Sequence, residues 1–307
     1  MSILVFGHKN PDTDTICSAI AYAELKGKLG KDVKAVRLGE INEETKFVLD
    51  YFKVEKPELI ESVSGKEIML VDHNERTQTA DGFEEAKVLE LVDHHRISNF
   101  NVDEPLYVRM EPVGCTATII LKLFKENNLL PAPTTAGLML SAIISDTLLF
   151  KSPTCTECDV KAGKELAEIA GVNVEEYGLE MLKAGTALGG KSEAELINMD
   201  MKIFEVDGSK IGVAQVNTVN EAELLERKEK LLEEINNIIN KEGLKFFIFA
   251  ITNILSNDST GIVAGDGNAV IEKAFNEKID NNLIALKGVV SRKKQIIPPL
   301  TKAIQEA

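Results

Sequence analysis

All four histidines of the chain lie in its first third, and each stands beside aspartates. His8 lies in the segment GHKNPDTD, His73 in VDHNE, and His94 and His95 in VDHHR. Imidazole and carboxylate groups together bind divalent metals. Each segment follows a short apolar run that is typical of a strand, and open α/β sheets bind ligands beyond the carboxyl ends of their strands. The pattern therefore predicts one composite metal site.

Aspartates near these histidines supply further candidate ligands. Asp12 and Asp14 lie where an apolar strand ends and a helix is expected to begin, so Asp12 or Thr13 could also serve only as the helix cap. Asp72 directly follows the apolar run 68–71. In a parallel sheet this strand end falls on the same edge as His8, so we expect the two side chains to converge.

A further carboxylate, Asp146, follows the apolar stretch 138–144. It is costly to bury there unless a charge or a metal compensates it, although an aspartate that merely ends a helix is the alternative. The combined set is large enough for two metals. Oxygen-rich ligands with a few imidazoles favour Mn²⁺ first, and also suit Co²⁺, Mg²⁺ or Fe²⁺. Two such ions about 3.5–4 Å apart can activate a water and stabilise a transferring phosphoryl group, which indicates hydrolysis of phosphate esters or anhydrides.

The elements around these residues predict an α/β fold for the first part of the chain. Short apolar segments alternate with segments of helical period, which favours a mostly parallel sheet with helices on both faces. We expect this sheet to carry the metal site at one edge. The expected strands are 3–6, 33–37, 67–71 and 87–92, and the expected helices are 13–29, 114–127, 134–147, 157–170 and 175–182.

Small, flexible residues from Gly185 to Ser192 interrupt the periodic pattern and predict a linker. Beyond it, a second, smaller α/β domain is expected from strands at 210–216, 246–251 and 261–264 and a charged helix at 221–240. The predicted organisation is a catalytic metal-binding domain over residues 1–187, a flexible linker over 188–193 and a second domain over 194–307.

Composition limits the partners and the location. A formal net charge of −14 argues against binding to nucleic acids or to anionic membranes. No stretch approaches the roughly 18 apolar residues of a membrane span, and the first residues lack the basic segment of a signal peptide, so we expect a cytoplasmic protein. Cys17 and Cys115 stand alone, and Cys155 and Cys158 form a single CxxC with no histidine after it. The four cysteines are therefore expected to be reduced thiols without a catalytic role, with a redox-active Cys155–Cys158 pair as the alternative.

Together these segments resemble a known family. GHKNPDTD, VDHNE, VDHHR and the stretch from Gly114 through SDTLLFKSPT resemble the DHH phosphoesterase superfamily, and SRKKQIIPPL is similar to the family II, manganese-dependent inorganic pyrophosphatases. The resemblance covers both domains. It implies a DHH-type first domain, a DHHA2-like substrate-binding second domain, a homodimer, and hydrolysis of pyrophosphate to two orthophosphates by two metals and a bridging hydroxide.

The same resemblance implies a role for each candidate ligand. One Mn²⁺ would be held by three residues and the other by four, with Asp72 bridging the two ions. Co²⁺ is a possible replacement, and Mg²⁺ would accompany the substrate. The first set is His8, Asp12 and Asp72, and the second is Asp14, Asp72, His94 and Asp146.

Further residues would act on the substrate. By resemblance His95 contacts it and serves as an acid, which suits a neighbour of a metal ligand that faces a polyanion. Asp93 is expected only to orient an imidazole. His73 is the least explained histidine. The phosphoryl groups would be bound from the second domain by Lys202, Arg292 and Lys293, with Lys9, Asn10 and Gln78 as weaker candidates.

Two alternatives stay open. A DHH phosphodiesterase or nuclease that acts on short oligonucleotides would share the metal ligands, but such relatives carry a glycine-rich GGGH-type motif in their second domain, and this chain has no histidine there. A non-catalytic phosphate-sensing module would retain the fold, and the intact set of candidate ligands disfavours it.

Overall fold

A computed structural model describes residues 2–186, 188 and 190–306. It divides the chain into two compact units, Met1–Gly185 and Thr186–Ala307. The predicted boundary at residue 187 and one residue of the predicted linker, Gly189, lie outside the described residues, so the predicted domain limits stay predictions. Every helix in the described part of the chain is too short or too polar to serve as a membrane span. The cytoplasmic location and the homodimer also stay predictions.

The N-terminal unit is built on a six-stranded sheet in which all neighbouring strands are parallel. Its order is β3-β2-β1-β4-β5-β6, so the chain reverses its direction across the sheet between β1 and β4. Open α/β sheets bind ligands at such a switch point. The strands are β1 (Ile3–Phe6), β2 (Val33–Arg37), β3 (Glu58–Leu59), β4 (Glu67–Val71), β5 (Lys87–Asp93) and β6 (Tyr107–Met110).

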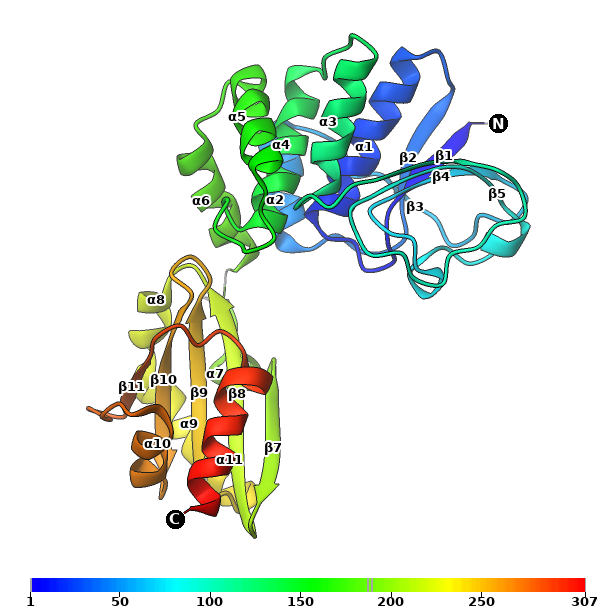
Figure 1. The fold of residues 1–307 in the computed structure, drawn as a ribbon. Coiled ribbons are helices and arrows are strands. Elements are labelled where there is room, and N and C mark those ends of the chain that lie inside the picture. The colour runs from blue at the N-terminus through cyan, green and yellow to red at the C-terminus, as the bar shows by residue number, and fades with distance from the viewer. Residues whose placement is uncertain (1, 187, 189, 307) are drawn as a thin grey trace. The chain divides into compact units, whose positions relative to one another are not determined.

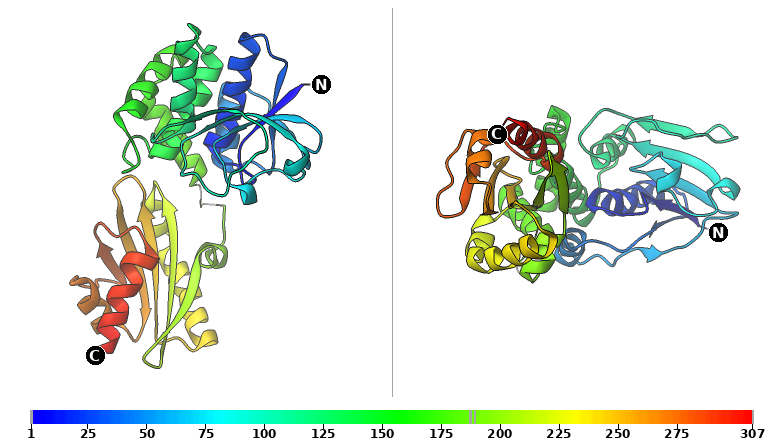
Figure 2. Two further views of the ribbon diagram at one scale, coloured as in Figure 1. Left: turned by 45° about the vertical axis from the view of Figure 1, so that its right-hand side comes forward. Right: turned by 90° about the horizontal axis from the view of Figure 1, so that it is seen from below.

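The α-helices of this unit gather on one face of the sheet (Figures 1 and 2). α1 packs against β1, β2 and β4, and α3 packs against β5. α4 packs against α1, α3 and α5 and is buried all round from Thr135 to Ile144, as its apolar sequence requires. The helices are α1 (Thr13–Lys28), α2 (Glu43–Phe52), α3 (Thr116–Glu126), α4 (Pro133–Thr147), α5 (Glu157–Ala170) and α6 (Val174–Gly185).

The opposite face of the sheet is covered by loops and short 3₁₀ turns. Because β4, β5 and β6 advance across the sheet away from β2 and β3, right-handed crossovers place their connections on this face. Those connections contain two 3₁₀ turns, and Phe83 packs there with Phe6 and Leu70. The α/β class and the parallel sheet are confirmed, with the α-helices on one face and the two 3₁₀ helices on the other.

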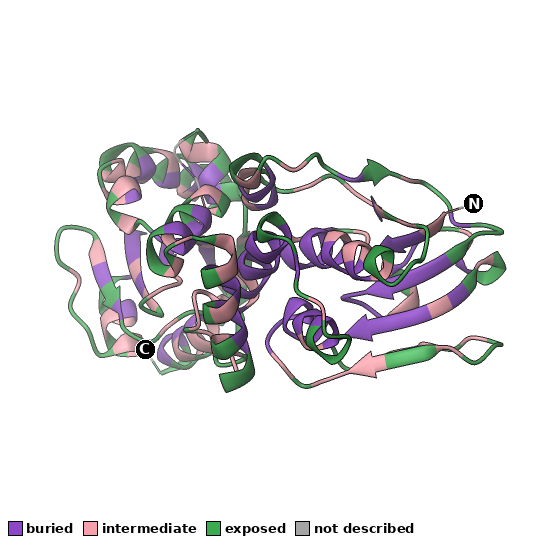
Figure 3. Ribbon diagram, turned by 90° about the horizontal axis from the view of Figure 1, so that it is seen from above, coloured by how far each residue is buried: buried purple, intermediate pink, exposed green. Residues whose placement is uncertain are grey.

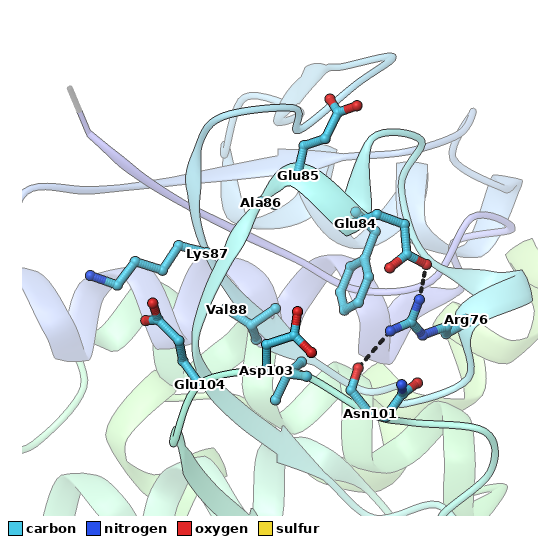
Figure 4. A pocket seen from close by; sticks show the side chains of 11 residues that line it. Arg76, Glu84, Glu85, Ala86, Lys87, Val88, Asn101, Asp103 and Glu104 are labelled. Atoms are coloured by element: carbon cyan, nitrogen blue, oxygen red, sulfur yellow. Dashed lines mark hydrogen bonds and ion pairs between the residues drawn. The ribbon is translucent and has the colours of Figure 1, made fainter.

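Burial falls off toward one edge of this sheet. Figure 3 shows the inner strands mostly buried, whereas β6 is exposed at its start and half-buried at its end. On the loop-covered face lies a cavity of about 320 Å³, where Arg76 forms an ion pair with Glu84 and donates a hydrogen bond to the carbonyl oxygen of Asn101 (Figure 4). None of the predicted site residues lines this cavity.

The C-terminal unit is a five-stranded mixed sheet of order β11-β10-β9-β8-β7. β8 and β9 are parallel, and the other neighbours are antiparallel. One apolar core lies on each face, with Phe247 and Phe249 on one side and Phe246 and Ile248 on the other. The strands are β7 (Met201–Val206), β8 (Ser209–Thr218), β9 (Phe246–Asn253), β10 (Asp258–Gly265) and β11 (Leu283–Leu286).

The helices of this unit differ in one respect from expectation. The single helix predicted at 221–240 is interrupted, because Arg227 leaves helical geometry and hydrogen-bonds to Glu193 and to the carbonyl oxygen of Lys191. A smaller α/β domain is otherwise as expected. The helices are α7 (Glu193–Asn198), α8 (Glu221–Leu225), α9 (Lys228–Glu242), α10 (Asn268–Phe275), a π-helical turn (Arg292–Ile296) and α11 (Ile297–Gln305).

Candidate metal centre

The loop after β1 and the start of α1 supply three of the candidate ligands. Gly7 allows the close approach of this loop to the helix, because a Cβ atom there would lie 2.6 Å from Cγ2 of Thr15. Asp12 is the N-cap of α1, and its Oδ1 accepts a hydrogen bond from the backbone N–H of Thr15 at 2.9 Å. Its other oxygen, Oδ2, lies 3.4 Å from Nε2 of His8. Capping therefore uses one oxygen of Asp12 and leaves the other for the site.

Asp14 lies in the first turn of the same helix and is completely buried. Its Oδ1 accepts from the Ser18 hydroxyl at 2.5 Å, and its Oδ2 accepts from the backbone N–H of Thr116 at 2.8 Å. The two donors come from α1 itself and from the start of α3. The orientation of this carboxylate is thus set by two elements far apart in the sequence.

Asp72 is the central residue of the group. It directly follows β4 with a φ of 58°, in the left-handed region, and is only 1% exposed. Its Oδ2 lies 3.6 Å from Nε2 of His8, and its Oδ1 lies 3.4 Å from Nε2 of His94. The Thr15 hydroxyl donates to Oδ2 at 2.6 Å, and the Thr116 hydroxyl donates to Oδ1 at 3.2 Å. Each oxygen of Asp72 therefore faces a different histidine.

His94 and His95 follow β5 and are oriented by different groups. Nδ1 of His94 lies 3.0 Å from the carbonyl oxygen of Val113, which fixes the proton on Nδ1 and leaves Nε2 free toward Asp72. Nδ1 of His95 lies 2.9 Å from Oδ1 of Asp93, whose other oxygen accepts from Asn74 at 2.6 Å. Asp93 thus orients an imidazole. His95 itself is half exposed.

Asp146 completes the group from the last turn of α4. Its Oδ2 lies 3.9 Å from Nε2 of His94 and is buried without a hydrogen-bond partner. Burial, and then the nearby charges of Asp14 and Asp72, raise the pKa of this carboxyl well above its usual range. A buried carboxylate oxygen with no donor is what a cation would satisfy.

Burial and neighbouring negative charges also shift the pKa values of other members of the group. Burial and the charge of Asp14 raise the pKa of Asp72 to about 7. Burial lowers the pKa of His94, but the hydrogen bond to Asp72 and the charge of Asp14 outweigh it and raise that pKa to about 9. Within the described residues, no lysine or arginine forms an ion pair with Asp12, Asp14, Asp72 or Asp146. The donor set therefore fits divalent cations.

Three clusters of potential ligand atoms arise from this geometry, each with its atoms within 4.8 Å of one another. Two of them contain Asp72, and the third adds the thiol of Cys115, which lies outside the predicted ligand set. Cys115 gave no signal in the sequence, because it lies 101 positions from Asp14 and stands in no metal-binding spacing. The clusters are His8–Asp12–Asp72, Asp72–His94–His95, and Asp14–Cys115–Asp146.

His73 stands apart from these clusters. Burial lowers its pKa to about 4, and its Nδ1 lies 2.9 Å from the carbonyl oxygen of Val71. Its Nε2 is buried without a partner. The ring lines a cavity of about 250 Å³ that also includes His8, Asp72 and His95 and the weaker candidates Asn10 and Gln78. Lys9, the third weaker candidate, forms an ion pair with Asp81 at 2.7 Å.

The predicted substrate-binding residues lie in the C-terminal unit. Lys202 is exposed on β7, and Lys293 is exposed in the π-helical turn. Arg292 begins that turn and pairs with Oδ1 of Asp200 at 2.8 Å, two residues before Lys202 in the chain. The backbone N–H of Arg292 donates to the side chain of Gln215 at 2.9 Å. Arg292 is therefore held beside the start of β7.

Comparison with known proteins agrees with this architecture. Residues 2–143 match the DHH family N-terminal domain, and residues 179–303 match the DHHA2 domain. A protein of Exiguobacterium sp. is 60% identical over 304 residues, covering 98% of each chain, and one of Bacillus cereus is 56% identical over 305 residues, covering 99% of each. Both are named as probable manganese-dependent inorganic pyrophosphatases.

A solved structure extends the similarity to the fold. A Methanococcus jannaschii protein assigned to the family II inorganic pyrophosphatases is 44% identical, with a TM-score of 0.64, covering 99% of this chain and 100% of its own. An exopolyphosphatase-related protein of Bacteroides fragilis, at 13% identity and a TM-score of 0.52, shares the fold. The chain therefore belongs to the family II, manganese-dependent inorganic pyrophosphatases.

Proposed function

We propose that the protein hydrolyses inorganic pyrophosphate to two orthophosphates at the edge of the N-terminal sheet. The proposal is supported by the names of relatives that match over nearly the whole chain. The observation that carries it is the convergence of buried carboxylates and imidazoles around Asp72, where no lysine or arginine among the described residues forms an ion pair with the carboxylates. Such a group requires cations, and cations attract a polyanionic substrate.

Two divalent ions, with Mn²⁺ as the first choice and Co²⁺ as a replacement, fit the donor set. We assign His8, Asp12 and Asp72 to one ion, and Asp72 with Asp14, His94 and Asp146 to the other. This division is supported by Asp72, whose two oxygens face His8 and His94 separately. When bound, such ions lower the pKa of a water and offset negative charge on a transferring phosphoryl group.

The chain's own residues orient the reacting groups. The carbonyl oxygen of Val113 holds Nδ1 of His94, so that Nε2 stays available as a ligand. Asp93 holds Nδ1 of His95 and raises the pKa of that imidazole, against the opposing effect of partial burial. The exposed His95 is thus suited to hand a proton from Nε2 to the oxygen of the departing phosphate.

Binding of the substrate anion is assigned to Lys202, Arg292 and Lys293. A guanidinium offers two parallel donors to a phosphoryl group, whereas an ammonium offers a compact charge. Arg292 would exchange the carboxylate of Asp200 for a phosphoryl group, which keeps its charge paired in both states. Mg²⁺ is expected to arrive with the substrate, because pyrophosphate binds this cation through its oxygens.

The test is reconstitution with single metals. The protein is stripped with a chelator and restored separately with Mn²⁺, Co²⁺ or Mg²⁺, and phosphate release is measured from pyrophosphate, polyphosphate and short oligonucleotides. We expect the fastest release from pyrophosphate with Mn²⁺. Faster turnover of an oligonucleotide would assign the site to a phosphodiesterase instead, and tight pyrophosphate binding without turnover would identify a sensing module.

A further inference from the structure

A carboxylate outside the candidate ligand set is completely buried in the same unit. Asp159 lies in the first turn of α5, and its side chain accepts four hydrogen bonds. Oδ2 accepts from the backbone N–H of Gly114 at 2.8 Å and from the N–H and hydroxyl of Thr156 at 2.8 and 2.6 Å. Oδ1 accepts from the Thr118 hydroxyl at 2.7 Å. One side chain therefore joins the start of α5 to the segment that leads into α3.

That segment, Val113–Thr116, contacts three of the proposed ligands. Its first residue provides the carbonyl oxygen that orients His94 at 3.0 Å. Its last residue donates to Asp14 through the backbone N–H at 2.8 Å and to Asp72 through the hydroxyl at 3.2 Å. Gly114 lies between these two ends, so the bond from its N–H to Asp159 fixes the part of the chain on which all three contacts depend.

The space around Gly114 shows how tightly the segment is held. A Cβ atom on this residue would lie 2.9 Å from Oδ2 of Asp159 and 2.8 Å from Cγ2 of Thr147. Thr147 is the neighbour of Asp146, a fourth proposed ligand. The segment therefore packs between the first turn of α5 and the last turn of α4. Movement of Asp159 would shift the segment and its packing against Thr147.

We propose that Asp159 is a positioning residue for the metal centre, which it reaches through Val113–Thr116 without contacting an ion or the substrate. Groups that orient metal ligands typically contribute 10–100-fold in metal affinity or activity. Asp159 stands one step further out, because it orients the segment that orients the ligands. Its sequence neighbours Cys155 and Cys158 have no part in this role, since the contacts run through the carboxylate alone.

The two variants that separate geometry from charge are Asp159→Ala and Asp159→Asn. The alanine leaves the buried N–H of Gly114 without a partner and frees the segment, so Mn²⁺ affinity is expected to fall by about 10–100-fold. The asparagine keeps an oxygen for Gly114 and Thr156, and its amide N–H can donate to the Thr118 hydroxyl, which both donates and accepts. Asp159→Asn should therefore bind Mn²⁺ nearly as tightly as the wild type.

The measurement is Mn²⁺ titration of the full-length protein, followed by kcat and KM for pyrophosphate. Glu90→Gln is the matched control, because Glu90 is another buried carboxylate, bound to Lys26 at 2.5 Å and Lys31 at 3.0 Å. Among the described residues it forms no hydrogen bond or ion pair with Val113–Thr116. It should lower the unfolding temperature without changing Mn²⁺ affinity. Unchanged Mn²⁺ affinity in Asp159→Ala, or equal loss in Asp159→Asn, would overturn the proposal.

Gly114→Ala provides a second route if Asp159→Ala does not fold. The added methyl group meets Asp159 and Thr147, so this variant should also bind Mn²⁺ more weakly, and wild-type affinity would count against the proposal. The inference rests on the proposed metal centre, and the two can fail separately. Absence of Mn²⁺ binding in the wild-type protein overturns both, whereas wild-type binding that survives in Asp159→Ala overturns only the role of Asp159.

Discussion

In the N-terminal unit Asp14 and Asp72 are almost fully buried, and both accept hydrogen bonds from elements other than their own. In the C-terminal unit Lys202 and Lys293 are exposed, and neither forms an ion pair among the described residues. The two units therefore differ in how far their charged side chains are held in place by the protein. The carboxylates are fixed before any ligand arrives, whereas the lysines are free to follow the substrate.

The largest effect is expected at the centre of the buried group. Asp72→Ala removes the carboxylate that faces both His8 and His94, so bound Mn²⁺ and phosphate release should both fall to background. Metal content after gel filtration and a phosphate assay give the result. Asp103→Ala, which removes an exposed carboxylate from the cavity on the loop-covered face of the sheet, should leave both values unchanged. Retention of metal and activity by Asp72→Ala would refute the ligand assignment.

A smaller loss, confined to turnover, is expected at the exposed edge of the same group. His95→Gln removes the proposed acid but leaves the buried carboxylates in place, so kcat should fall by about 10²-fold or more while Mn²⁺ affinity stays close to that of the wild type. Steady-state kinetics and metal titration on the same preparation separate the two quantities. If Mn²⁺ affinity falls along with kcat, His95 is a ligand and not an acid.

The C-terminal unit should respond through substrate affinity. Lys202→Ala removes one cationic contact to the anion, which corresponds to a rise in KM of about 10-fold or more with unchanged Mn²⁺ affinity. Lys294→Ala is the matched control, because Lys294 is exposed in the same turn as Lys293 and has no assigned contact. If the two substitutions raise KM equally, the substrate responds only to the overall positive charge of the unit. Lys202 would then have no specific contact with the substrate.

The smallest effect concerns the metal-free protein and its pH dependence. Asp72 binds its proton more tightly when folded, because its pKa is raised to about 7 from an ordinary value of about 3.9. The stability it contributes is fully present below that ordinary value and is lost as the pH rises through 7. His94, with its pKa raised to about 9, likewise loses its contribution as the pH rises from about 6.5 through 9.

Thermal unfolding of the chelated protein should therefore begin at lower temperature as the pH is raised from 5 to 9, by a few degrees in all. With Mn²⁺ bound, the carboxylates face a cation and the trend should vanish or reverse. Asp72→Asn removes one titrating group and should flatten the curve below pH 7. If the unfolding temperature of the chelated wild-type protein does not change with pH, the raised pKa values of Asp72 and His94 are wrong.

Much of the N-terminal unit could be predicted because its signals are local. The strands at 3–6, 33–37 and 67–71 appear with the expected bounds, since each is a short apolar run between turn residues. The convergence of His8, Asp72 and His94 follows from one rule, that parallel strands end at a common edge. Their roles as metal ligands stay predictions. Their proximity follows from the sheet order, in which β1, β4 and β5 are neighbours.

Other features depend on contacts that no local pattern encodes. Asp159 lies 45 positions from Gly114, and nothing near it in sequence indicates that its carboxylate holds that N–H. The break in the predicted helix 221–240 depends on Glu193, which is 34 positions from Arg227. Arg292 and Asp200 are 92 positions apart, so their pairing could not be anticipated either. Long-range hydrogen bonds such as these become visible only when the fold is complete.

The reversal of strand order between β1 and β4 has a further consequence for the way this unit folds. The proposed ligands come from segments as distant as His8 and Asp146, and the strands between them pair only in parallel, which is a slow, non-local mode of assembly. No fragment of the sheet holds the whole set. Uptake of Mn²⁺ should therefore be the last event in folding, and a refolding experiment that follows bound metal would report completion of the N-terminal unit.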